Sequence, residues 1–124
     1  WAAKMVANII RKPIQYAYMD VDHVQELPEC DTIMLFSVLH HTKDFMKNAA
    51  KVSAACSRII LETRLRENGA QPTATGDWER TNSLQFNTLE ELTNFYEGVF
   101  PGFQFKTNLG IATKFRYILE FVKG

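Results

Sequence analysis

The spacing of hydrophobic and polar positions along the chain distinguishes predicted strands from predicted helices. Residues 32–39 form an apolar run on both faces, which is typical of a central strand in a parallel sheet. Shorter apolar or alternating runs predict further strands, and apolar residues three and four positions apart predict helices. The predicted strands cover 14–19, 32–39, 58–61, 103–106 and 115–122, and the predicted helices cover 2–11, 44–56 and 89–99.

The predicted order is helix, strand, strand, helix, strand, helix, strand, strand. Strand–helix alternation that ends in two neighbouring strands predicts an α/β fold with a doubly wound sheet. The last two strands are predicted to form an antiparallel hairpin joined through Asn108 and Gly110. We expect Thr42 or the preceding histidine to cap the second helix, and Thr88 with Glu91 to form a capping box on the third.

Length, charge and cysteine usage narrow the classes of function. The 124 residues suffice for one domain, and 14 basic residues balance 14 acidic ones. No overall field therefore attracts the chain to nucleic acid or to an anionic membrane. No apolar run approaches the roughly 18 residues that a membrane span needs. Cys30 and Cys56 have neither disulfide nor zinc spacing, and we expect buried thiols in a cytoplasmic protein.

Two short motifs carry candidate chemistry. The apolar run within DTIMLFSVLHHTKD, residues 31–44, ends on His40 and His41. Adjacent histidines point in different directions, so they cannot chelate one ion as a pair on one face. The second motif, DVDH at residues 20–23, follows a predicted strand. Its D-x-D carboxylates are compatible with a metal-binding pair, as in some phosphatases and glycosyltransferases, or with a solvated turn.

Several stretches together carry a resemblance to a known family. IQYAYMD, LPECDTIMLFSVLHH and SRIILET, followed by a helix and two strands, resemble the second half of a class I S-adenosylmethionine (SAM)-dependent methyltransferase. The resemblance implies a Rossmann-like sheet in which Asp20 accepts from the adenine amine and the Val21 N–H serves a ring nitrogen. It also implies that Phe36, Val38 and His40 line the methionine side of the cofactor, where open parallel sheets bind ligands.

One branch of that family is more similar in its later part. LETRLRENG, the long irregular segment and the late helix resemble the enzymes that alkylate the wobble uridine of tRNA. The resemblance matches Arg116 to an arginine that opens the last strand of those enzymes. Where this chain has His40 and His41, that branch has Tyr-His, so a hydroxyl donor is missing.

Few residues are candidates for binding the substrate or for taking part in the transfer reaction. Trp78 and Arg80 lie in the irregular segment 64–86, where they are candidate substrate contacts, although Trp78 could equally anchor the loop. His41 is a candidate general base or a histidine that packs at the helix start. Methyl transfer from a sulfonium often needs only alignment and desolvation, so the sequence compels no catalytic base.

Two features of the family are missing from the sequence. The six glycines form no glycine-rich turn, and no acidic residue ends an earlier second strand. Residues 1–124 are therefore predicted to be a single truncated domain that lacks the first two strands, with its front half upstream of Trp1. Without those strands the edge of 32–39 is unpaired, which predicts a homo-oligomer or pairing with the missing half.

These observations support three hypotheses. The first is a carboxyl-terminal portion of a SAM-dependent methyltransferase that acts on a small molecule or an RNA base. The second is a non-catalytic methyltransferase-like module that associates with itself or with a partner. The third is a metal-dependent hydrolase or transferase built on Asp20 and Asp22. None of the three hypotheses includes a membrane as a partner.

Overall fold

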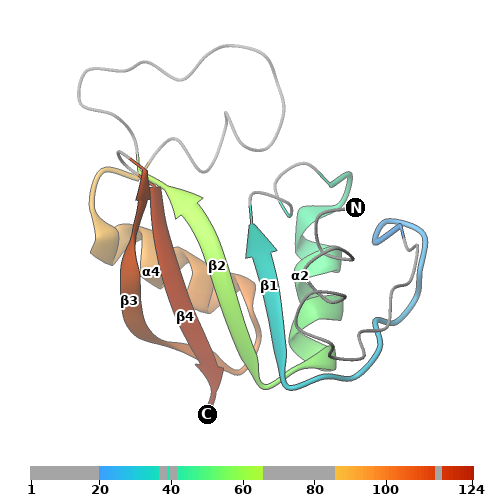
Figure 1. The fold of residues 1–124 in the computed structure, drawn as a ribbon. Coiled ribbons are helices and arrows are strands. Elements are labelled where there is room, and N and C mark those ends of the chain that lie inside the picture. Colours follow the sequence, from blue (N-terminus) through green and yellow to red (C-terminus); the bar gives the residue numbers. More distant parts are fainter. Residues whose placement is uncertain (1–19, 37–38, 40–41, 66–85, 114–115) are drawn as a thin grey trace, which may run out of the picture.

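The computed structural model describes residues 20–36, 39, 42–65, 86–113 and 116–124. Two helices and four strands follow one another in the order strand, helix, strand, helix, strand, strand (Figure 1). This is the predicted order for that part of the chain. The elements are β1 (Thr32–Phe36), α2 (Phe45–Ala55), β2 (Arg58–Arg64), α4 (Leu89–Val99), β3 (Phe103–Thr113) and β4 (Arg116–Lys123).

The four strands form one mixed sheet in the order β1-β2-β4-β3. Strand β1 pairs in parallel with β2, so that Phe36 lies opposite Glu62. Strand β4 is antiparallel to both of its neighbours and lies between β2 and β3. No strand within the described ranges pairs with the other edge of β1. The parallel strands β1 and β2 therefore end at the same edge of the sheet, where β4 begins.

Helix α2 begins at a different cap from the predicted one. The Asp44 carboxylate accepts a 3.1 Å hydrogen bond from the Lys47 N–H, which is the usual N-cap interaction. The Thr42 hydroxyl instead donates to the Leu39 carbonyl at 2.6 Å. The expectation that Thr42 or the preceding histidine caps this helix is therefore wrong, because Asp44 fills that position.

Helix α4 starts with the predicted pair of Thr88 and Glu91. The Thr88 hydroxyl accepts from the Glu91 N–H at 3.2 Å, which confirms the cap. The Glu91 carboxylate accepts from the Asn87 N–H at 3.0 Å, one residue before the N-cap position that a capping box uses. Two N–H groups at the start of α4 are thus satisfied locally.

The core lies between the two helices and one face of the sheet. Helices α2 and α4 contact each other on this face, where the rings of Phe45 and Phe95 stack with centroids 6.3 Å apart. The Tyr96 hydroxyl lies 3.4 Å from the Thr63 hydroxyl, so this buried phenol has a partner. The largest buried apolar side chains are Tyr96, Phe100, Phe121, Ile59, Leu92, Leu119 and Val52.

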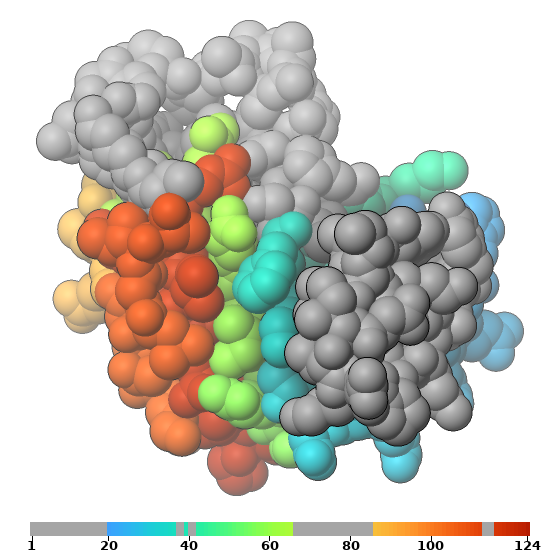
Figure 2. Space-filling view, viewed as in Figure 1, coloured from blue at the N-terminus to red at the C-terminus, as the bar shows by residue number. Residues whose placement is uncertain are grey.

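The other face of the sheet, which we call the open face, carries ion pairs. Figure 2 looks onto this face, and within the described ranges no helix covers it. Glu120, at its centre, is buried by Arg58, whose Nε donates at 2.6 Å, and by the Lys106 ammonium at 3.4 Å. The apolar side chains of Met34 and Phe36 also lie on this face, with 64% and 48% of their surface exposed.

Strand β3 corrects the predicted connection between the last two strands. Asn108 and Gly110 lie inside β3, where the register with β4 shifts between them. The Asn108 carboxamide accepts from the Gly110 N–H at 2.9 Å, and Gly110 has a φ of 145° that favours glycine. These residues therefore form an irregularity of the edge strand, and the actual connection lies at 114–115, outside the described residues.

Two further expectations can be compared with the structure. Cys56 is buried as expected, but Cys30 is exposed, because it precedes β1 on the surface and does not enter the core. Neither of the two helices described here is long and apolar enough to cross a membrane.

Candidate functional site

The DVDH motif forms a compact turn in which the backbone carbonyl and the side-chain carboxylate of Asp20 each accept hydrogen bonds from the residues that follow. The Asp20 carbonyl accepts from the N–H groups of His23 and Val24, at 3.0 and 3.1 Å. The Asp20 carboxylate accepts from the Asp22 N–H at 3.0 Å and contacts the His23 Nδ1 at 2.6 Å. The motif is therefore a self-bonded turn, which we call the DVDH turn.

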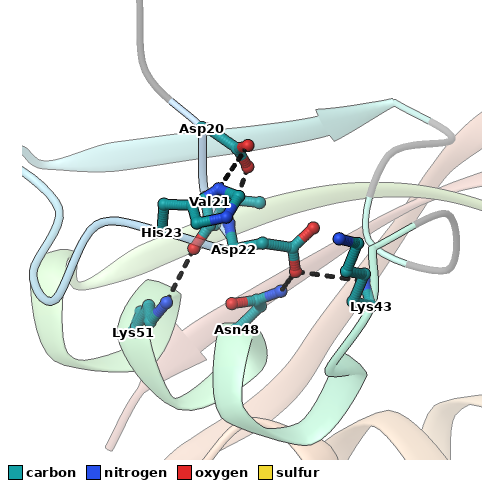
Figure 3. Close-up of polar contacts among 7 residues, drawn as sticks. All are labelled: Asp20, Val21, Asp22, His23, Lys43, Asn48 and Lys51. Carbon is teal, nitrogen blue, oxygen red and sulfur yellow. Dashed lines mark hydrogen bonds and ion pairs between the residues drawn. The ribbon is translucent and has the colours of Figure 1, made fainter.

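The second aspartate attaches this turn to the start of α2. Asp22 Oδ1 accepts from the backbone N–H of Lys43 at 3.0 Å and from the Asn48 carboxamide at 2.7 Å (Figure 3). Lys43 lies in the segment that follows β1, and Asn48 is a fully buried residue in α2. The DVDH turn thus lies beside the connection from β1 to α2, on the side of the sheet where ligands bind in open α/β folds.

A buried lysine makes the third attachment. The Lys51 side chain is only 9% exposed, and its ammonium donates to the Val21 carbonyl at 2.6 Å (Figure 3). Asn48 and Lys51 lie three positions apart on α2, so their side chains leave the helix on the same side. One face of α2 consequently holds both Val21 and Asp22.

Hydrogen bonds favour the ionised form of both carboxyl groups in the turn. The hydrogen bond from His23, with a further one from the Asp22 N–H, lowers the pKa of Asp20. The hydrogen bond from Asn48 is the main cause that lowers the pKa of Asp22. Both groups are therefore carboxylates, and hence acceptors, at neutral pH.

The exposed edge of the turn offers an acceptor next to a donor. The Asp20 side chain is 59% exposed, and its ionised carboxylate has room for further donors. The Val21 N–H has no acceptor in the part of the chain that the structure describes. A ligand that presents a donor next to an acceptor, as the amine and ring nitrogen of adenine do, is complementary to this edge.

A second group of predicted residues lies on the open face. Phe36 ends β1 and lies opposite Glu62 on β2. Glu62 accepts from the guanidinium of Arg116 at 3.2 Å, and Arg116 starts β4. Phe36 and Arg116 therefore share the edge at which β1 and β2 end. In the described residues no hydrogen bond or ion pair links this group to the DVDH turn.

Five of the predicted site residues belong to segments that the structure does not describe. Val38, His40, His41, Trp78 and Arg80 lie outside the described residues.

Asn48 and Lys51 are the residues that the sequence analysis missed. The signal that would have identified them is a polar residue next to each of the buried positions Ala49 and Val52 on one helix.

The geometry around the two aspartates does not favour a metal ion. Asp22 is engaged by two nitrogen donors and Asp20 by two others. Among the residues that the structure describes, no three His, Cys, Asp or Glu side chains are grouped to hold a metal ion. The D-x-D spacing serves here to build and anchor a turn.

Comparisons with known sequences and known structures gave different results. No protein-family model matches the chain, and no curated protein matches it. Solved structures do match it at the level of the fold. LaPhzM matches with a TM-score of 0.62 and 19% identity, over 99% of this chain and 39% of its own.

The structural matches include two different proteins that are described as methyltransferases. Magnesium protoporphyrin IX methyltransferase (ChlM) from Synechocystis PCC 6803, with bound SAH, matches with a TM-score of 0.60 and 16% identity, over 99% of this chain and 58% of its own. Mitomycin 7-O-methyltransferase MmcR matches with a TM-score of 0.58 and 16% identity, over 98% of this chain and 38% of its own. The chain thus spans between about two fifths and three fifths of these structures.

The fold is shared more widely than the reaction. A protein described as a pericyclic reaction enzyme matches with a TM-score of 0.58 and 11% identity, over 97% of this chain and 34% of its own. A fold can host different reactions, so function has to be argued from the site. What the comparisons establish is that this α/β chain has, over the part that they cover, the fold of these methyltransferases.

Proposed function

We propose that this chain is the carboxyl-terminal portion of a SAM-dependent methyltransferase of the cytoplasm. In this proposal its strands are the later strands of a Rossmann-like sheet, with β3 and β4 as the closing hairpin and the first two strands absent. The strand order β1-β2-β4-β3, with β4 antiparallel between two strands, supports this assignment. So does the fold shared with ChlM, which was solved with bound SAM as well as SAH.

The observation that carries the proposal is the exposed edge of the DVDH turn. The Asp20 carboxylate accepts from the adenine amine, and the Val21 N–H donates to the neighbouring ring nitrogen. Phe36, half exposed at the end of β1, packs along the cofactor together with Val38 and His40. The acceptor of the methyl group is a small molecule or an RNA base, bound on the side of Trp78, Arg80 and Arg116.

Methyl transfer demands little acid–base chemistry from this portion. The sulfonium methyl group is electrophilic on its own, so the protein mainly aligns donor and acceptor and excludes water. His41 is a candidate for removing a proton from the acceptor. If the acceptor is an RNA base, the resemblance of Arg116 to an arginine of the tRNA-alkylating branch points to a base of tRNA.

The test compares ligands that differ only at the adenine amine. SAH and its deaminated analogue S-inosylhomocysteine are titrated into the chain, into Asp20→Ala, and into Asp31→Ala, which removes an exposed carboxylate outside the turn. We expect the chain and Asp31→Ala to prefer SAH, because an oxo group would face the Asp20 carboxylate. Asp20→Ala should lose about tenfold in SAH affinity and most of the preference. Equal SAH binding in all three proteins would place the adenine elsewhere.

A second candidate function, a non-catalytic module that self-associates, is favoured by a different observation. Strand β1 has no second partner among the described strands, and Met34 and Phe36 are exposed along it. Such an edge can pair with another copy of the chain. Sedimentation velocity over a wide concentration range tests this, since a strictly monomeric chain that binds SAH would reject the module.

A further inference from the structure

We propose that Lys51 is a positioning residue for the adenine-binding edge, acting through the Val21 carbonyl, with Asn48 as its second anchor through Asp22. This inference rests on the proposed function of the DVDH turn. It assigns to α2, which touches no part of the cofactor in that proposal, the task of orienting the donor that reads the adenine.

The argument starts from the two peptide groups that flank Val21. In a trans peptide the carbonyl and the N–H point in opposite directions. The carbonyl of the Asp20–Val21 peptide is held by the N–H groups of His23 and Val24, so the Val21 N–H points away from the turn. The next peptide is held at both ends, by Lys51 at its carbonyl and by the Asp20 carboxylate at its N–H.

Lys51 is the member of this set that comes from outside the turn. Its ammonium group spans 30 positions in the sequence to reach Val21. In the described part of the chain it forms no ion pair with a carboxylate. Among the described residues the ammonium has one neutral carbonyl as its partner, and in this part-buried contact it gives up part of its hydration, which costs free energy. Holding the geometry of a ligand-reading turn is a function that accounts for this cost.

Asn48 completes the attachment. Its carboxamide nitrogen donates to Asp22 Oδ1 at 2.7 Å, and Asp22 also accepts from the Lys43 N–H. The Asn48 side chain is fully buried, and its Oδ1 has no hydrogen-bond partner among the residues that the structure describes. The carboxamide is therefore held in place for its nitrogen alone. Asp22 and Val21 are thus fixed by two side chains of the same helix.

The experiment compares Lys51→Met, Lys51→Arg and the control Lys47→Met. Methionine keeps the apolar stem of Lys51 and removes its donor. Arginine keeps a donor, and a neighbouring cavity of about 210 Å³, lined in part by Leu27, Ala54 and Ala55, has room for its larger head. Lys47 is exposed on the same helix. Each protein is titrated with SAH and with S-inosylhomocysteine.

We expect Lys51→Met to lose about tenfold in SAH affinity and to lose preference between the two ligands. Lys51→Arg should recover most of both, and Lys47→Met should match the unaltered chain. A merely structural role would lower the affinity for both ligands by the same factor and leave the preference unchanged. That result, or an unchanged SAH affinity in Lys51→Met, would overturn the inference.

A second measurement separates this inference from the proposed function. Hydrogen exchange of the Asp22 and His23 amides, followed by NMR without ligand, reports the order of the turn directly. Faster exchange in Lys51→Met, with melting temperature and α4 amides unchanged, is expected if Lys51 holds the turn. Unchanged exchange contradicts the tether whether or not SAH binds. Failure of the unaltered chain to bind SAH rejects the proposed function and, with it, the ligand half of the inference.

Discussion

The ammonium group of Lys51, buried on α2, donates a 2.6 Å hydrogen bond to the carbonyl of Val21, in a turn that precedes β1. A residue of the proposed adenine site is thus held by a helix that follows the next strand along the chain. The site and the packing of α2 are coupled through this contact. Substitutions of Lys51 and Asn48 should consequently change the order of the turn and, with it, ligand binding.

Asn48→Asp tests the buried attachment at Asp22. The new carboxylate would lie where the carboxamide donates at 2.7 Å, so two like charges would meet in a part-buried contact. We expect the free energy of unfolding at neutral pH to fall by about 1–3 kcal/mol, the cost of losing this hydrogen-bond donor. Part of it should return near pH 4, when one carboxyl group is protonated. Chemical denaturation at both pH values measures this, and Asn94→Asp on the exposed side of α4 should change little.

Phe121 and Phe36 should separate stability from binding. Phe121 is fully buried among the rings of Tyr96, Phe100 and Phe105. Phe121→Ala should cost about 3–5 kcal/mol of unfolding free energy. Phe36→Ala should stay within about 0.5 kcal/mol of the unaltered chain, because the ring is half exposed, yet weaken SAH binding. A Phe36→Ala variant with full affinity would remove this residue from the proposed site.

Glu120 should make the stability of the chain depend on acid pH. The hydrogen bond from Arg58 is the main cause that lowers the pKa of Glu120 below its ordinary value of 4.5. A lowered folded-state pKa adds stability that is fully present above 4.5 and is lost as the pH falls through the folded-state value. Melting temperatures should therefore fall more steeply below about pH 5 in the unaltered chain than in Glu120→Gln. Parallel curves for the two proteins would argue against this role, and Glu29→Gln is the exposed control.

The two cysteines should differ sharply in reactivity. Cys30 is exposed, whereas Cys56 is buried and its thiol donates to the Val52 carbonyl at 3.3 Å. Burial raises the pKa of Cys56, which lowers the fraction of reactive thiolate. A thiol reagent should label one cysteine per chain quickly and the second only on denaturation, as mass spectrometry of Cys30→Ser can verify. Fast labelling of that variant would mean that α2 and β2 open readily.

The sequence predicted the order of the described elements because their hydrophobic periods are strong. The start of α4 was also predictable, since Thr88 and Glu91 can satisfy the first N–H groups with their own side chains. The start of α2 was not, because Thr42 and Asp44 are both good caps. Only the fold shows that the Thr42 hydroxyl is engaged by Leu39.

The edge strand β3 shows a second limit of sequence reading. Asn and Gly two positions apart favour a tight turn, but the same local hydrogen bond also builds an irregularity inside a strand. Gly110 adopts the positive φ that either structure requires. Pairing with β4 over a much longer stretch decides between them, and that pairing is a tertiary interaction.

The candidate site was predictable in part. Asp20 and Val21 were identified from a resemblance. The structure shows Asp20 as an exposed carboxylate, and the Val21 N–H has no acceptor within the described ranges. Asp22 was read as half of a metal pair or as part of a solvated turn. Its actual partners, Lys43 and Asn48, lie more than twenty positions later, and their contact depends on how α2 packs.

A calorimetric titration of SAH into the chain tests the central claim most directly. The account predicts saturable binding in the micromolar range, weakened about tenfold in Asp20→Ala and unchanged in Asp31→Ala. No heat at millimolar SAH, with the chain shown to be folded by its circular dichroism, would contradict the claim that the DVDH turn binds the adenine of the cofactor.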